Sequence, residues 1–293
     1  MRIPNPLKPW FVYRPGQLLR RVARAVRPPS DPVQVVDLPW GCSLQIDTRE
    51  TIGRAIWTCG VYDLSVAEVL TRLADPKLLA IDAGANIGAM TGLLAICAAE
   101  VWAFEPHPDV CHRLVGNVAR FVGHTGFAPC RVFEQALSDS DGEARLENTD
   151  GFAANHGLAR ITGGVGIPVA TARLDTLLGD REVGLMKLDV EGHELSVLRG
   201  AETALAAGRV RHIVFEDHVG PESPVCSYLA IQGYRLFEIG WRLTGPHVTS
   251  PGRRGARAYE APSYLATRDP VGATARCGIR GWECLSRSRR ATR

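Results

Sequence analysis

Two short apolar runs, Leu-Leu-Ala-Ile-Asp at 78–82 and Val-Trp-Ala-Phe-Glu at 101–105, decide the fold of this chain. Each run has the length of a buried strand and ends in an acidic residue. Between them lie Gly-Ala-Asn-Ile-Gly at 84–88 and a helical stretch that continues to Ala99. A strand, a helix of this length and a second strand form a unit in which the two strands run parallel.

The same alternation of strands and helices continues on both sides of this unit. Residues 138–170 interrupt it, because they are rich in Gly, Asp, Asn and Thr and are expected to hold a hairpin and a loop. We therefore predict an α/β fold built on a mostly parallel, doubly wound sheet of about seven strands, with helices on both faces. The expected helices are 61–73, 108–121, 194–207 and 227–232, and the expected strands are 131–136, 185–189, 211–216, 234–239 and, at the edge, 263–267.

Composition and charge exclude several classes of protein. The chain has 293 residues, 45% of them hydrophobic and 22% charged, and its formal net charge of +3 is too small to indicate nucleic acid. Its 8 cysteines include no Cys-x-x-Cys pair, which argues against a disulfide scaffold and a structural zinc site. The sequence has no run of about 18 apolar residues and no signal-peptide pattern, so the expected location is the cytoplasm.

Both ends of the chain are rich in arginine. Residues 1–32 are expected to form a basic N-terminal arm, with a helix near 16–26 in which apolar residues and arginines share a helical spacing. Such a helix could lie on an anionic membrane surface, on its own domain or on a second subunit. Residues 33–268 are the expected main domain, with its motifs at 78–240, and the arginine-rich residues 269–293 are expected to be disordered.

The glycine loop at 84–88 and the acids on either side of it indicate a nucleoside ligand. At the carboxyl ends of such strands, Glu105 can accept hydrogen bonds from ribose hydroxyls. The loop lacks the Gly-x-Gly-x-x-Gly pattern of dinucleotide sites and the Gly-Lys-Ser/Thr of phosphate loops. Asp82 at its entrance suits a cationic ligand such as S-adenosylmethionine, which carries an ammonium and a sulfonium group. The alternative is a plain turn flanked by two solvated acids.

Five segments taken together resemble the FkbM-type methyltransferases. They are Ile-Asp-Ala-Gly-Ala-Asn-Ile-Gly at 81–88, Phe-Glu-Pro at 104–106, Ala-Leu-Ser-Asp at 136–139, Leu-Asp-Thr-Leu-Leu at 174–178 and Met-Lys-Leu-Asp-Val-Glu-Gly-His-Glu at 186–194. The resemblance covers residues 78–240 and implies a Rossmann-like class I methyltransferase fold for the domain at 33–268. It also implies S-adenosyl-L-methionine as the cofactor and O-methylation of hydroxyls on sugars, glycolipids or secondary metabolites.

The resemblance further implies a role for each residue that matches the family's cofactor motifs. Glu105 would hold the ribose, and Ala136 and Leu137 would border the adenine. The residues expected around the methionine part of the cofactor are Asp82, Gly84, Asn86 and Gly88.

Asp189, Glu191 and His193 lie where a strand leads into a helix, at the same end of the sheet as the glycine loop. Methyl transfer requires an acceptor oxygen aligned with the methyl carbon and a group that removes the hydroxyl proton. His193 is the expected base, with Asp189 or Glu191 orienting it or binding the acceptor. The same three side chains could instead hold Mg²⁺ or Mn²⁺. Glu194 is expected only to begin the helix.

Other polar segments give weaker indications. Glu216-Asp217-His218 follows a strand and either contacts the substrate or forms a surface turn, and Asn155-His156-Gly157 lies in a loop that could cover the site. The expected partner is a small-molecule, sugar or glycolipid acceptor, whose identity the sequence does not encode. The alternatives are N-methylation, a nicotinamide- or nucleotide-sugar-binding oxidoreductase or epimerase, nucleic-acid methylation, and a binding module without catalysis.

Overall fold

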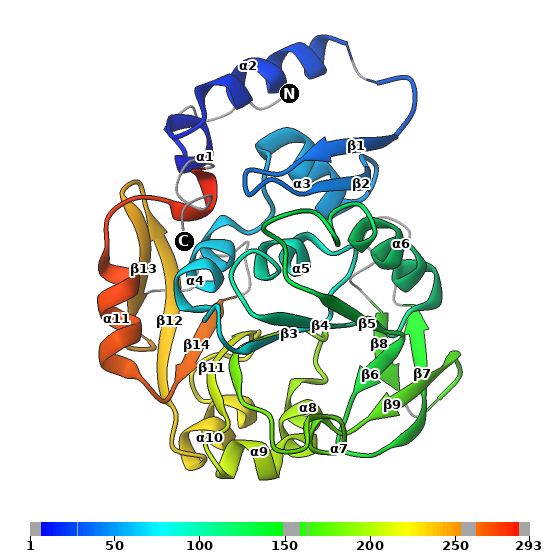
Figure 1. Ribbon diagram of the computed structural model, residues 1–293, viewed down its shortest axis with the longest axis vertical. Helices are drawn as coiled ribbons and strands as arrows, with labels where there is room; N and C mark the ends of the chain where they lie inside the picture. Colours follow the sequence, from blue (N-terminus) through cyan, green and yellow to red (C-terminus); the bar gives the residue numbers. More distant parts are fainter. Residues whose placement is uncertain (1–6, 28, 149–158, 163, 253–261, 287–293) are drawn as a thin grey trace.

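The computed structural model describes residues 7–27, 29–148, 159–162, 164–252 and 262–286. In these residues, the largest element is an eight-stranded sheet with strand order β13-β12-β14-β11-β10-β3-β4-β5 (Figure 1). Strands β11, β10, β3, β4 and β5 run parallel, whereas β14, β12 and β13 pair in the antiparallel sense. The bounds of the strands are β3 (Leu79–Ala83), β4 (Glu100–Phe104), β5 (Cys130–Phe133), β10 (Val183–Leu188), β11 (Val210–Glu216), β12 (Arg235–Arg242), β13 (Gly245–Thr249) and β14 (Ser263–Thr267).

Helices cover both faces of this sheet, as predicted. On one face lie α4 (Leu64–Leu73), α5 (Ala89–Leu94) and α6 (Pro108–Val118). On the other lie α7 (Leu174–Leu178), α8 (Glu194–Gly200), α9 (Glu202–Ala206) and α10 (Pro224–Ile231) (Figure 1). Side chains along β3 alternate between the two cores, with Ala80 in the first and Ile81 in the second. The doubly wound α/β class is therefore confirmed.

Several boundaries differ from the expected ones for local reasons. The sheet has eight described strands instead of about seven, because the chain turns back after β12 and β13 pairs with it. Strand β14, expected at the edge, lies between β11 and β12. Helix α4 begins only at Leu64, because the Asp63 side chain accepts a hydrogen bond from the Val66 amide and caps it there.

The expected strand at 131–136 is divided between two sheets. Strand β5 ends at Phe133, and β6 (Gln135–Leu137) pairs with β9 (Ile167–Ala172) in a separate four-stranded sheet of order β6-β9-β7-β8. This sheet also contains the expected hairpin, formed by β7 (Gly142–Asn148) and β8 (Ala159–Thr162). The hairpin sheet thereby places residues of β6, β7 and β8 beside the carboxyl ends of the main strands.

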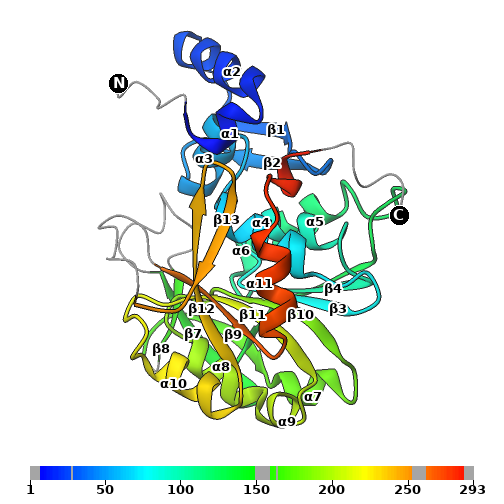
Figure 2. The same cartoon turned by 90° about the vertical axis from the view of Figure 1, so that its left-hand side faces the viewer.

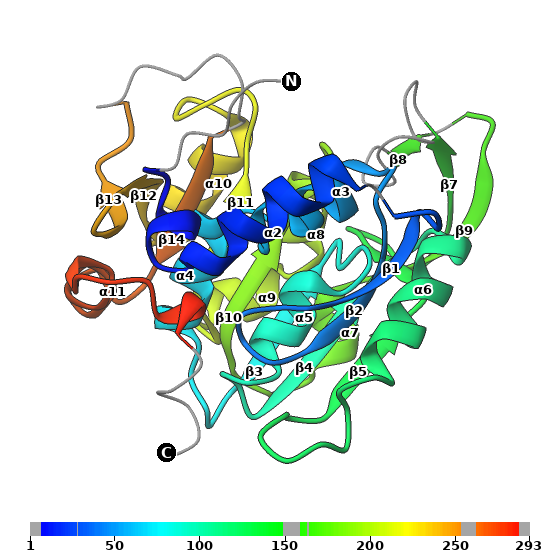
Figure 3. The same ribbon diagram turned by 90° about the horizontal axis from the view of Figure 1, so that it is seen from above.

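The N-terminal residues form helices and a small sheet. Helices α1 (Pro9–Val12) and α2 (Pro15–Val26) precede a two-stranded sheet of β1 (Val33–Asp37) and β2 (Ser43–Asp47), which α3 (Thr51–Cys59) follows. Helix α2 packs alongside α3, as the view from above shows (Figure 3). None of the helices in the described residues is both long enough and apolar enough to cross a membrane.

The expectation of a disordered tail from residue 269 is wrong for residues 269–286. This segment forms α11 (Pro270–Gly278), which lies beside α4 (Figure 2), and a short 3₁₀ helix, η1 (Glu283–Leu285). Its apolar residues enter the core on the α4 side of the sheet: Ala273, Cys277, Trp282, Cys284 and Leu285. Residues 287–293 lie outside the described residues.

A buried ion pair holds this tail. Arg72 and Glu68, both on α4, are almost fully buried and lie 2.6 Å apart. The Arg72 guanidinium also donates to the carbonyl oxygens of Arg276, Ile279 and Gly281. The Glu68 carboxylate accepts the amides of residues 283 and 284. The order of this segment could not be predicted from its arginine-rich composition. The ion pair binds backbone groups of the tail, which every sequence has, and not its side chains.

Candidate active site

A cavity of about 280 Å³ lies at the carboxyl ends of β3, β4, β10 and β11. The hairpin sheet contributes Leu146, Ala159 and Ile161 to its wall, and the N-terminal region contributes Ile52 and Tyr62. This is the end of an open α/β sheet at which ligands bind. Of the residues that the sequence singled out, the following line the cavity: Gly84, Asn86, Glu105, Ala136, Leu137, Asp189, Glu191, His193, Glu216 and His218.

The glycine loop turns sharply beside this cavity. Gly84 has a φ of +76°, and a side chain there would collide with the backbone carbonyl of Asp189. The amides of Gly84 and Ala85 both donate to the Phe104 carbonyl at 3.0 Å, which fixes the loop against the end of β4. Glycine is therefore required at position 84 for both its conformation and its close contact with the neighbouring loop.

Glu105 is held against this loop by backbone amides. Its Oε2 accepts the Asn86 amide and its Oε1 accepts the His107 amide, both at 3.0 Å. Burial raises the pKa of Glu105 to about 7, although the two amide hydrogen bonds act in the opposite direction. Each oxygen retains a lone pair, so the carboxylate can also accept hydrogen bonds from a ligand in the cavity.

Asp82 and Gly88 are not among the residues that line the cavity, so their place around the methionine part of the cofactor stays a prediction. Asp82 is fully buried, accepts a 2.6 Å hydrogen bond from the Thr91 hydroxyl, and lies 3.3 Å from the Lys187 ammonium. Gly88, with a φ of +92°, precedes α5, and a Cβ there would lie 2.9 Å from Leu114 Cδ1. Both residues pack against buried elements next to the loop: Asp82 against α5 through Thr91, and Gly88 against Leu114 of α6.

Lys187 is a buried cation beside the glycine loop, and no functional role was expected for it from the sequence. Its ammonium lies 3.3 Å from both Asp82 and Asp189 and donates to the Gly84 carbonyl at 2.9 Å. Burial alone would lower the pKa of Lys187, but the carboxylates of Asp189 and Asp82 outweigh it and raise that pKa. The alternation along β10, which puts Lys187 and Asp189 on one face, is the signal that could have revealed this contact.

Three carboxylates gather at the other end of the cavity: Asp189, Glu191 and Glu216, here called the acidic cluster. Burial, together with the charge of Asp189, raises the pKa of Glu191 to about 7 and that of Glu216 to about 8. Tyr62 lines the same region, and burial followed by the charge of Asp189 raises its pKa. No sequence signal indicated Tyr62, because it comes from the N-terminal region outside the motifs.

His193 faces a different neighbour. Its Nε2 lies 3.0 Å from the Ser138 hydroxyl, and burial lowers the pKa of the ring, with a partial opposing effect from Asp139. The lowered pKa leaves the imidazole neutral near pH 7, which is the form that accepts a proton. Ser138 directly follows Leu137, so this hydrogen bond joins the two sides of the cavity.

Glu194 and Asp217 are structural. Glu194 Oε1 accepts the amides of Val190 and Gly192 at 3.2 Å and so closes the turn that carries Glu191 and His193. Asp217 accepts the amides of Val219 and Gly220 and forms a turn. Asn155-His156-Gly157 lies outside the described residues.

The metal alternative finds no support in the arrangement of side chains. In the described ranges, no three or more His, Cys, Asp or Glu residues are grouped so that they could hold a metal ion. The acidic cluster is instead adjacent to Lys187, which already neutralises part of its charge.

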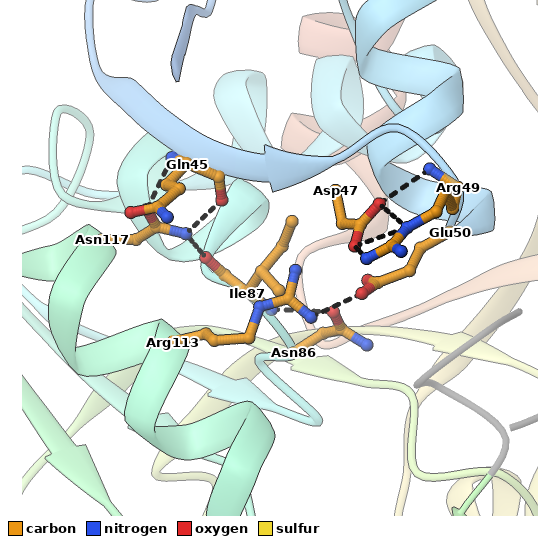
Figure 4. Close-up of polar contacts among 8 residues, drawn as sticks. All are labelled: Gln45, Asp47, Arg49, Glu50, Asn86, Ile87, Arg113 and Asn117. Atoms are coloured by element: carbon orange, nitrogen blue, oxygen red, sulfur yellow. Dashed lines mark hydrogen bonds and ion pairs between the residues drawn. The ribbon is translucent and has the colours of Figure 1, made fainter. Parts of the chain in front are cut away.

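The N-terminal region supports the glycine loop through two residues of α6 (Figure 4). The Asn117 side chain accepts the Gln45 amide at 2.7 Å and donates to the carbonyls of Gln45 and Ile87 at 3.1 and 2.8 Å. Arg113 donates to Glu50 at 2.6 Å. Asn117 therefore connects β2 to the loop that carries Asn86, and Arg113 connects the start of α3 to α6.

Comparison with known proteins agrees with this geometry. The family model described as the methyltransferase FkbM domain matches residues 82–236, which include the glycine loop, Glu105 and the Asp189–His193 turn. The chain belongs to the FkbM methyltransferase family.

Two curated proteins are similar to part of this chain. The hexuronic acid methyltransferase AglP of Haloferax volcanii is 37% identical over an alignment of 144 residues that covers 47% of this chain and 55% of AglP. The AMB antimetabolite synthetase AmbE of Pseudomonas aeruginosa is 26% identical over 228 residues, covering 62% of this chain and 10% of AmbE. The chain thus spans about half of one curated relative and a small part of the other. The crystal structure of methyltransferase FkbM from Methylobacillus flagellatus KT superimposes with a TM-score of 0.44 and 15% identity, covering 65% of this chain and 44% of that one.

Proposed function

We propose that this FkbM-family protein is an S-adenosyl-L-methionine-dependent methyltransferase that methylates a hydroxyl group of a neutral, sugar-like acceptor. The observation that carries the proposal is a single cavity with the glycine loop and Glu105 on one side and Asp189, Glu191 and His193 on the other. Glu105, the expected nucleoside-binding acid, and His193, the candidate base, therefore line the same cavity.

The lining of the cavity fits the cofactor of this family. Glu105 would accept hydrogen bonds from the ribose, and the small and apolar side chains of Ala136 and Leu137 would border the adenine. Asp189, which lies against the glycine loop, suits the positive charge of the sulfonium next to the acceptor. When bound, S-adenosyl-L-methionine supplies an electrophilic methyl group. The glycine loop that would surround it is fixed by hydrogen bonds from its own amides to the Phe104 carbonyl and to Glu105, and from Lys187 to the Gly84 carbonyl.

The acceptor class follows from the acidic cluster. Its carboxylates, with Tyr62, can bind several hydroxyl groups of one polyol through hydrogen bonds. AglP acts on a hexuronic acid, which carries a carboxylate of its own. In this chain an acceptor carboxylate would lie among three acidic side chains, and Lys187 is already paired with two carboxylates. We therefore infer a neutral acceptor in place of a uronic acid.

His193 would accept the proton that the acceptor hydroxyl loses as the new carbon–oxygen bond forms. The Ser138 hydroxyl fixes the imidazole ring of His193. Burial lowers the pKa of this ring and so keeps it neutral at physiological pH. Asp189, Glu191 and Glu216 would orient the acceptor, which reduces the entropic cost of alignment. The products are the methyl ether and S-adenosylhomocysteine.

The test is transfer of a radiolabelled methyl group from S-adenosyl-L-methionine to matched acceptors, namely methyl glycosides, glycolipids, uronides and amines. We expect labelled ethers from the neutral sugars or glycolipids and little product from the corresponding uronides. His193→Gln should lower kcat by about 100-fold or more and leave the affinity for S-adenosylhomocysteine unchanged. The exposed His124→Gln is the control. Product found only with uronides or amines, or an active His193→Gln variant, would contradict the proposed roles.

A further inference from the structure

The first thirty residues contain basic residues and no acidic residue. The charged residues that precede Asp31 are Arg2, Lys8, Arg14, Arg20, Arg21, Arg24 and Arg27. Helix α2 carries three of these arginines, Arg20, Arg21 and Arg24, together with Leu18, Leu19 and Val22, so it is both basic and amphipathic. These seven residues outweigh the whole protein's formal net charge of +3, so the rest of the chain is net acidic, at −4 (3 − 7).

One face of α2 is fixed to the protein. The Arg24 guanidinium lies over the Trp57 ring, 3.6 Å from its centroid, and donates to the Trp57 carbonyl. Gln17 is buried and donates to the Thr58 carbonyl. Both contacts are with α3, so the rotation of α2 about its own axis is determined.

The opposite face of α2 is left to the solvent. Leu19 is 73% exposed and Val22 is 53% exposed, and their spacing of three residues puts them on one side of the helix. Arg20 and Arg27 are exposed on the same helix and immediately after it. On α1 and the adjoining turn, Val12 and Tyr13 are also about half exposed. The result is an apolar strip bordered by arginines.

The charge of this strip distinguishes among the partners that could cover it. A second copy of the chain would bring the same arginines into contact with themselves, which is unfavourable. Nucleic acid would satisfy the arginines and leave the large apolar side chains in water. An anionic bilayer satisfies both, because lipid phosphates attract the arginines and the acyl boundary takes up Leu19 and Val22. We propose that α2 binds the surface of an anionic membrane through its Leu19–Val22 face.

This binding would bring the candidate active site close to the membrane. Helix α2 packs on α3, and α3 contributes Ile52 to the cavity wall. Helices α2 and α3 thus connect the proposed membrane-binding face to the cavity wall. Resting on the proposed function, this arrangement favours an acceptor hydroxyl on a glycolipid headgroup, although the membrane binding itself does not depend on methyl transfer.

The test is sedimentation of the full-length protein with vesicles of phosphatidylcholine alone or mixed with phosphatidylglycerol, at about 0.1 M salt and at high salt. We expect binding to the mixed vesicles that weakens at high salt. Arg20→Gln combined with Arg27→Gln should lower the partition coefficient by roughly 30-fold, and Leu19→Ser or Val22→Ser by on the order of tenfold each.

Two matched controls lie on the opposite end of the molecule (Figure 1): Ile231→Ser, 84% exposed on α10, and Arg199→Gln, exposed on α8. Both should bind vesicles like the parent protein, and all variants should bind S-adenosylhomocysteine equally if they are folded. Absence of binding to the anionic vesicles would overturn the proposal. So would a dimer in lipid-free solution that Leu19→Ser dissociates, because a second copy would then cover this face.

Discussion

Single residues of the site are constrained by their surroundings more than by their own chemistry. Gly84 lies against the Asp189 backbone, Lys187 bridges two carboxylates, and Glu105 is buried between two backbone amides. These contacts join β3, β4 and β10 at the point where their carboxyl ends meet. A substitution at any of them therefore changes several elements at once.

Gly84→Ala should destabilise the protein by about 3 kcal/mol or more, because the added Cβ combines an unfavourable positive φ with a collision against backbone atoms. Gly123→Ala is the matched control: its φ is +88°, and a Cβ there meets no atom within 4 Å. Gly123→Ala should lower the free energy of unfolding by only about 1 kcal/mol. Urea unfolding of the two variants measures the difference, and equal losses would show that the contact with Asp189 is unimportant.

The affinity for S-adenosylhomocysteine should depend on pH through Glu105. Burial raises the pKa of Glu105 to about 7, so the free protein carries it largely neutral below that pH. A ribose that donates hydrogen bonds favours the ionised form, and binding then releases a proton. Affinity should therefore rise with pH, by up to about tenfold per unit, and level off above about pH 7.

Glu105→Gln separates this effect from the titration of Glu191, Glu216 and His193, which line the same cavity. Its affinity should be lower and should lose the part of the pH dependence that belongs to Glu105. Calorimetry in buffers of different ionisation enthalpy also counts the released protons directly. An unchanged pH profile in the variant would exclude Glu105 as the titrating group.

At this scale the sequence predicted residues that belong to motifs and missed those that do not. Glu105, Asn86 and Asp189 follow strands in a recognisable order, and all three line the cavity. Tyr62 lies well before the first motif, and only the folded chain brings it to the acidic cluster. Asp82 was expected around the methionine part of the cofactor because it precedes the loop; in the folded chain it is buried and accepts a hydrogen bond from Thr91.

Among the secondary-structure elements, α6 has a role that its sequence does not reveal. Its Asn117 is buried and connects β2 to the glycine loop (Figure 4). The strands with an acid at their carboxyl end could be predicted, because their apolar runs are short and continuous. The division of the chain at residue 134 and the position of β14 could not, because pairing partners depend on contacts between distant residues.

Asn117→Ala should lower the free energy of unfolding by about 2–4 kcal/mol, because the Gln45 amide, the partly buried Gln45 carbonyl and the buried Ile87 carbonyl lose their partner. Hydrogen exchange at residues 84–88 should also become faster than in the parent protein. Val115→Ala, on the exposed side of the same helix, should lower the free energy of unfolding by less than about 0.5 kcal/mol. Similar effects of the two variants would contradict a supporting role for Asn117.

At the scale of the whole molecule, segments from both ends of the chain complete the central domain. The tail enters the core beside α4, and the N-terminal region forms part of the cavity wall. The tail was expected to be disordered, because arginine-rich segments resemble disordered ones when their partners are unknown. Ile52 and Tyr62 lie within the expected main domain, but no motif indicated that they reach the cavity. The doubly wound class itself followed from the alternation of strands and helices alone.

Arg72→Met should destabilise the protein by about 3–5 kcal/mol, because it leaves Glu68 as an unpaired buried charge and removes the donors to three tail carbonyls. The tail after residue 268 should then become sensitive to limited proteolysis. Arg54→Met, on the exposed side of α3, is the control and should change neither property. Resistance of the tail in the Arg72 variant would show that apolar packing alone holds it.

The central claim is that the cavity binds S-adenosyl-L-methionine through Glu105. Its most direct test is calorimetric titration of the purified protein at about pH 8, above the raised pKa of Glu105, with S-adenosylhomocysteine and, in parallel, with NAD⁺. We predict one site of roughly micromolar affinity for S-adenosylhomocysteine, weakened about tenfold or more by Glu105→Gln, and no binding of NAD⁺. Binding of NAD⁺ in place of S-adenosylhomocysteine, or an affinity for S-adenosylhomocysteine that Glu105→Gln leaves unchanged, would contradict the claim.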